Sequence, residues 1–197
     1  MSFWTQTDAE EMQNPKRKFR FIVQFDGITD GTAWWAKGLN KPSFTIAAGE
    51  HKYLNHTFYY PGSVTWDEIS MTLVDPVSPD MASTLTDIVQ ASGYKPPTMP
   101  SGTGDELETI SKSGAAAALK TVTITQVNAD GDALEEWVLQ NAWISSLKYG
   151  DLEYGGDDLT ELTLVMKYDW ATLTATNTAG SIATDGTGAG SGPYFDV

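Results

Sequence analysis

Apolar and polar residues alternate along much of this chain, and that pattern restricts it to a mainly β fold. The clearest case is the run in which Phe19, Phe21, Val23 and Phe25 occupy every second position. Successive side chains of a strand point to opposite faces, so a period of two predicts strands that bury one face. Strands are predicted in this way at 19–25, 34–39, 64–74, 119–127, 134–140 and 159–170, and residues 43–60 are expected to be extended but irregular.

One segment has a helical period instead. Met81, Leu85, Ile88 and Val89 fall on one helical face, and Gly93 is suited to end the helix. The alanine run at 115–118 is expected to lead into the next strand, and residues 128–132 are expected to form a hairpin turn. The prediction is therefore antiparallel β-sheets that form a sandwich or barrel, with one packed α-helix.

Composition divides the chain into a domain and a tail. Residues 1–171 contain all the predicted strands and are expected to fold as one domain, with a Pro- and Gly-rich surface loop at 95–114. Residues 172–197 are rich in Thr, Ala and Gly. Such a segment buries too little apolar surface to offset its ordering entropy, so we expect a C-terminal tail.

Charge narrows the possible partners. The formal net charge is −14, yet residues 1–52 hold 7 of the 12 Lys and Arg and only 6 of the 26 Asp and Glu. Binding DNA by phosphate neutralisation needs clustered cations, so the acidic remainder argues against it. The acidity suits a protein that lies near nucleic acid without adhering to it, or simply one that must stay in solution. No apolar run predicts a membrane span or a secretory signal.

No pattern in the sequence predicts catalysis, a metal or a cofactor. The chain has no cysteine, and its two histidines, His51 and His56, are five residues apart with no carboxylate cluster beside them. Nucleophile elbows and phosphate-binding Gly-rich loops are absent from the sequence. We therefore expect no catalytic residues and no enzyme activity. The seven Trp and eight Tyr residues allow a carbohydrate-binding module as an alternative, although packing in the core or at subunit contacts is the favoured interpretation.

Two segments carry a resemblance to a known family. Residues 59–75 place a Pro-Gly pair before a strand that contains Trp66 and ends at Asp75. Residues 137–170 contain a strand, a Trp-containing connection and a closing strand that ends in Tyr168, Asp169 and Trp170. This order of elements resembles the tail tube proteins of T4-like contractile-tailed bacteriophages, over about residues 15–171.

The resemblance implies a structural virion protein rather than an enzyme. It implies stacked hexameric rings that form the inner tail tube and conduct DNA during ejection without binding it specifically. The implied partners are further copies of the chain, the tail sheath protein, and the baseplate and tail-terminator proteins. The implied location is the virion tail, after synthesis in the cytoplasm of the bacterial host. A baseplate tube initiator and the tube of another injection system share the same fold and remain alternatives.

The resemblance also suggests two sets of functional residues. The stretch from Gly49 to Tyr60 matches the loop that reaches the adjacent ring in related tubes. The expected ring-stacking residues are Lys52, Tyr53, His56, Phe58, Tyr59 and Tyr60. Polar strand faces are expected to line the lumen, where carboxylates would repel DNA phosphates. The lumen candidates are Glu68, Ser70, Thr72, Glu161 and Thr163.

Overall fold

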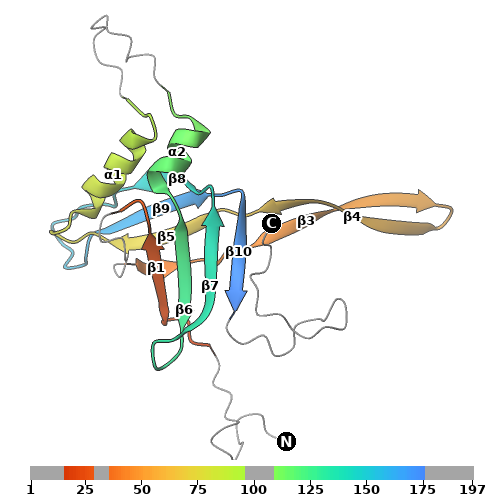
Figure 1. Ribbon diagram of the computed structural model, residues 1–197, viewed down its shortest axis with the longest axis horizontal. Helices are drawn as coiled ribbons and strands as arrows, with labels where there is room; N and C mark the ends of the chain where they lie inside the picture. Colours follow the sequence, from red (N-terminus) through yellow and green to blue (C-terminus); the bar gives the residue numbers. More distant parts are fainter. Residues whose placement is uncertain (1–15, 29–35, 96–108, 176–197) are drawn as a thin grey trace, which may run out of the picture.

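Two four-stranded antiparallel sheets pack face to face in the computed structural model, which describes residues 16–28, 36–95 and 109–175 (Figure 1). The first sheet has the order β1-β6-β7-β10, formed by Phe21–Phe25, Val122–Val127, Ala133–Gln140 and Trp170–Ala175. The second sheet has the order β2-β5-β9-β8, formed by Ala36–Leu39, Ile69–Val74, Glu161–Lys167 and Trp143–Lys148. The predicted mainly β, antiparallel architecture is confirmed.

The core lies between these sheets and follows the sequence alternation. In β5, Ile69, Met71 and Leu73 are fully buried, while the residues between them face outward. Their counterparts in the first sheet include Val23 and Phe25 of β1. Burial of one face per strand is therefore the main apolar stabilisation of the fold.

Two helices within the described residues lie side by side beyond one end of the sandwich (Figure 1). The predicted helix is α1, Met81–Ala91, which buries Met81, Leu85 and Ile88. Its N-cap is Asp80, whose side chain accepts a hydrogen bond from the Ser83 N–H at 2.9 Å.

The second helix, α2 at Lys112–Leu119, corrects the expectation that the alanine run leads directly into a strand. Ser111 caps α2 by accepting a hydrogen bond from the Gly114 N–H at 3.0 Å. Alanine has the highest helix propensity, and here it continues the turn that the cap begins. The strand that follows, β6, starts only at Val122.

Two predicted strands are each divided in the structure. The segment 64–74 breaks after Trp66, where one strand ends, and resumes with β5 at Ile69. The segment 159–170 breaks at Asp169, because β9 belongs to the second sheet and β10 to the first. Asp169 fixes the chain where it passes from the second sheet to the first, because its carboxylate accepts hydrogen bonds from Lys112 at 2.7 Å and Asn141 at 2.9 Å. Apolar alternation marks both halves of such a segment equally and cannot show where the chain changes sheets.

Residues 43–60 are the largest correction, because they are regular rather than irregular. They belong to a long antiparallel hairpin formed by β3, Phe44–Tyr53, and β4, His56–Trp66. Pro61 and Gly62, the Pro-Gly pair expected to form a turn before the next strand, lie inside β4, opposite a register shift between Ile46 and Ala48. The expected domain boundary at 171 falls within β10, which continues to Ala175; residues 176–197 and most of the 95–114 loop lie outside the described residues.

A cluster of charges joins the two sheets at one edge of the sandwich. Glu135 of β7 is almost fully buried and forms salt bridges with Lys16 and Lys41. Lys41 also donates to the Gln126 side chain at 2.7 Å, and Trp137 donates to Glu135 at 3.4 Å. Burial raises the pKa of Glu135, but the hydrogen bonds and charges of the two lysines outweigh burial, so this pKa lies below its usual range.

Replacing Glu135 with Gln is expected to destabilise the fold at neutral pH. The pKa of the Glu135 carboxyl is lower in the folded chain than in the unfolded chain. Such a group stabilises the folded state fully when the pH is above the unfolded pKa. The stabilisation is lost as the pH falls through the folded pKa. Urea unfolding should therefore show a loss of about 1–2 kcal/mol for Glu135→Gln at pH 7, and a much smaller loss near pH 3. The matched control is Glu136→Gln, on the outer face of the same strand. An equal loss at both pH values would contradict the ion-pair explanation.

Candidate subunit interface

The β3–β4 hairpin projects from the sandwich as an isolated two-stranded ribbon (Figure 1). Every residue of the two strands is exposed except Trp66, which is half-buried. Large apolar side chains remain uncovered in it, and Leu54 at the tip is 85 % exposed. A two-stranded ribbon with no second layer is marginal in water, and uncovered apolar side chains of this kind are typical of surfaces that take part in protein contacts.

The two faces of the hairpin differ in chemistry. Antiparallel partners share a face, and the pairs His51–Phe58 and Tyr53–His56 place both histidines of the chain on an aromatic face. The next residue along that face in β4 is Tyr60. The other face contains Glu50, Lys52, Thr57 and Tyr59. Thus the six predicted ring-stacking residues do occur together on the hairpin, but they divide between its two faces.

Aromatic packing fixes the base of the hairpin to the sandwich. The Phe44 and Trp66 rings lie 5.1 Å apart between centroids, and Trp66 lies 5.8 Å from Tyr168 in the loop between β9 and β10. Rings at these separations interact favourably in tilted arrangements. Burial raises the pKa of Tyr168 to about 12, so the phenol stays neutral in the core. The ribbon is therefore anchored firmly at one end only.

Hydrogen bonds fix the direction in which the hairpin leaves the second sheet. Asn40, just after β2, donates to the Glu68 carbonyl at 3.0 Å and accepts from the Ser70 N–H at 2.6 Å. The Ser43 hydroxyl donates to the Asp67 carboxylate at 2.9 Å, and the Asp67 N–H donates to the Ser43 carbonyl at 2.9 Å. These bonds span the break between β4 and β5 and hold it in one geometry.

The five predicted lumen residues gather on the outer face of the second sheet. Thr72 of β5 and Thr163 of β9 are direct antiparallel partners. Alternation puts Ser70 and Glu161 on the same face, and Glu68 lies immediately before β5. Whether this face lines a channel stays a prediction.

Lysines offset both carboxylates on this face. Glu68 forms a salt bridge with Lys167 at 2.9 Å, and Glu161 forms one with Lys37. The hydrogen bond to Glu161 and its charge raise the pKa of Lys37. The face is consequently polar and mixed in charge rather than uniformly acidic.

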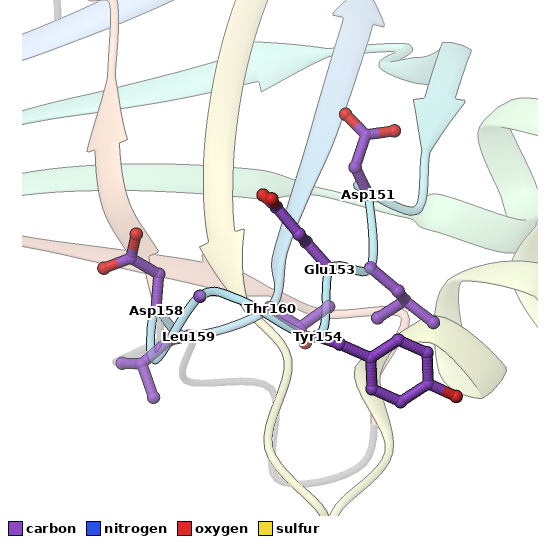
Figure 2. A pocket seen from close by; sticks show the side chains of 8 residues that line it. Asp151, Glu153, Tyr154, Asp158, Leu159 and Thr160 are labelled. Atoms are coloured by element: carbon purple, nitrogen blue, oxygen red, sulfur yellow. The ribbon is translucent and has the colours of Figure 1, made fainter.

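A second projecting surface, which was not predicted from the sequence, is the segment 149–160 between β8 and β9, here called the acidic loop. Gly150 begins it with a φ of +79°, and a Cβ there would lie 2.4 Å from the Glu161 carbonyl oxygen, so the turn requires glycine. The loop forms an open pocket of about 500 Å³ lined by its own residues (Figure 2). Leu152 and Tyr154 are almost fully exposed beside the carboxylates of Asp151, Glu153 and Asp158. The alternation of Leu152 and Tyr154 with Asp151 and Glu153 is the signal in the sequence that could have indicated this surface.

Among residues 16–28, 36–95 and 109–175, no three or more His, Asp or Glu side chains converge as a metal site. None of the helices in the described part of the chain is long and apolar enough to span a membrane. Trp66, Trp137, Trp143 and Trp170 are all half-buried, as the packing interpretation of these residues requires. That the chain has no enzyme activity stays a prediction.

Comparison by sequence finds no relative, since no family model and no curated protein matches the chain. Solved structures do match. A chain of the PVC sheath/tube terminator of an extracellular contractile injection system, in the extended state, aligns with a TM-score of 0.62 and 18% identity, covering 83% of this chain and 99% of that one. A chain of the anti-feeding prophage tube terminating cap aligns with a TM-score of 0.63 and 16% identity, covering 85% and 96%.

A chain of the PVC sheath–tube complex in the extended state gives a TM-score of 0.60 at 18% identity, with coverage of 87% of this chain and 99% of that one. These alignments include almost the whole of each matched chain, so the likeness is not confined to one motif. Identities this low establish architecture rather than activity. The protein described here therefore has the fold of chains found in the tube and terminator assemblies of contractile injection systems.

Proposed function

We propose that this protein is a structural subunit of the inner tube of a contractile tail. The observation that carries the proposal is the exposed hairpin, which leaves apolar and aromatic side chains uncovered on a subunit whose own core is complete. Such a surface fits permanent assembly with further copies. The shared fold with chains from sheath–tube and terminator structures supports the same role.

The full proposal is a phage tail tube built from stacked hexameric rings, through which DNA passes during ejection. In a ring, each subunit contacts its neighbour head-to-tail, and six such contacts close on themselves. Sheath, baseplate and terminator proteins are the proposed partners, and matched chains come from sheath–tube, baseplate and terminator structures of contractile injection systems. A baseplate tube initiator, or the tube of an injection system that carries no DNA, is the nearest alternative.

Deleting residues 50–57 should leave folded subunits that cannot form tubes. The deletion removes the outer half of the hairpin but none of the buried core residues or the Asn40 contacts at its base. Circular dichroism and thermal unfolding should therefore match those of the intact protein, while electron microscopy should show no polymer. Tubes of normal length from the deletion variant would contradict the assigned role of the hairpin.

Reversing charge on the proposed lumen face should slow DNA passage without blocking assembly. Glu68→Lys with Glu161→Lys would remove both salt-bridge acceptors and leave two pairs of lysines on this face, one with Lys167 and the other with Lys37 near the opposite end of β9. Each ring would then attract phosphate. DNA ejection from assembled tails should be slower at low salt and recover toward about 1 M salt, where screening acts within a few ångströms.

The matched control reverses charge on the other sheet. Asp130→Lys lies in the β6–β7 turn and Glu136→Lys lies on the outer face of β7. This pair should leave ejection unchanged. If the control pair slowed ejection and the Glu68 and Glu161 pair did not, the first sheet rather than the second would line the lumen.

A carbohydrate-binding module is the competing class of function. It requires an exposed aromatic platform, and the exposed tyrosines of the hairpin, Tyr53, Tyr59 and Tyr60, are the surface that could supply one. Electron microscopy and polysaccharide retention together separate the two functions. Rings or tubes support the tube proposal, whereas monomers retained on polysaccharide support the module.

A further inference from the structure

We propose that the hairpin tip of one copy docks onto the acidic loop of the next copy. This inference rests on the proposed tube function and adds the partner surface that the hairpin meets. The tip comprises residues 51–57, and the acidic loop comprises residues 149–160. Both surfaces belong to the same chain, so each subunit offers one half of the contact at each end.

The first argument is the position of the two surfaces in the fold. β5 runs away from the hairpin base, and its far end pairs Val74 with Glu161, where the acidic loop enters β9. Figure 1 shows the hairpin and this end of the second sheet at opposite ends of the molecule. At a rise of about 3.3 Å per residue, the hairpin and β5 together place the tip roughly 50 Å from the loop. The two surfaces cannot meet within one chain, and between copies they form a head-to-tail contact that can propagate.

The second argument is charge. The acidic loop contains four carboxylates, Asp151, Glu153, Asp157 and Asp158, and no Lys or Arg. The tip contains one cation, Lys52, and no carboxylate, although Glu50 follows on the face of Lys52. Complementary charges of this kind steer association and select the partner surface.

The third argument is shape and apolar content. The loop forms an open pocket of about 500 Å³ lined by side chains of both kinds (Figure 2). In that view the carboxylates of Asp151, Glu153 and Asp158 point to one side, while the ring of Tyr154 points away from them. The tip offers Leu54 and Tyr53, both largely exposed, as apolar groups that could enter the pocket. Specific protein interfaces combine apolar groups with polar and charged groups, and both surfaces offer this combination.

Disulfide cross-linking tests the contact directly, because the chain has no cysteine of its own. Asn55→Cys labels the hairpin turn, and Gly156→Cys labels the acidic loop, where an added Cβ meets nothing within 4 Å. Oxidising an equal mixture of the two single variants should give a covalent dimer, and neither variant alone should do so. A chain with both substitutions should give a ladder of higher oligomers. Asn55→Cys mixed with Asp130→Cys, an exposed turn residue of the first sheet, is the matched control.

Charge reversal then tests the chemistry of the contact. Adding Lys52→Glu to the Asn55→Cys chain should lower the rate of cross-linking to Gly156→Cys by about fivefold at low salt. Adding Asp151→Lys and Asp158→Lys to the Gly156→Cys chain should restore most of that rate. Failure of this restoration would mean that charge does not select the acidic loop and would overturn the proposal.

Electron microscopy of the unsubstituted protein separates failure of the docking inference from failure of the proposed function. If tubes form but the mixed variants cross-link no faster than the control, the acidic loop is not the partner and the tube function stands. If neither tubes nor cross-links form, both the proposed function and the docking inference fail. Tubes together with a cross-link above the control support both.

Discussion

Packing of the two sheets against each other is the constraint on which the other features depend. Because each strand buries alternate residues, a slip of one residue would expose Ile69, Met71 and Leu73 together, so the register of β5 and β9 is strongly fixed. That register places the hairpin base at one end of the second sheet and the acidic loop at the other. The polarity of the subunit, with different surfaces at its two ends, therefore follows from its apolar core.

Much of this architecture was predictable, because alternation reports directly on a two-layer β structure. Most strands of the two packed sheets, the antiparallel class and the helix that buries Met81, Leu85 and Ile88 follow from local periodicity. Helix α2 was not predicted, because its alanines give no clear division into an apolar and a polar face. In the sequence only the capping residue Ser111 indicates where it starts. The changes of sheet near Asp67 and Asp169 were not predictable, because hydrogen bonds to distant residues such as Asn40 and Lys112 fix them.

The candidate interface was predicted in its composition but not in its form. Clustered aromatic residues between 49 and 60 suggested a contact surface, and the structure shows them on a regular ribbon. Regularity was hidden because both faces of the hairpin are exposed, so no alternation between core and solvent shapes its sequence. The acidic loop was harder to find, since its Asp and Gly residues also fit an ordinary turn.

Two groups of carboxylates differ in role: some are paired within the folded subunit, and others would gain a partner only on assembly. Several carboxylates on the sandwich are paired with lysines, as in Glu135 with Lys16 and Lys41, and such pairs satisfy groups that the fold itself brings together. In the acidic loop, by contrast, four carboxylates lie close in sequence with no Lys or Arg among residues 149–160, so like charges repel one another in the free subunit, although the charge of Asp158 also acts on Lys37. A cationic hairpin tip from another copy would relieve that repulsion. Assembly would then gain electrostatic free energy that folding alone leaves unrealised, which would favour the polymer without altering the stability of the sandwich.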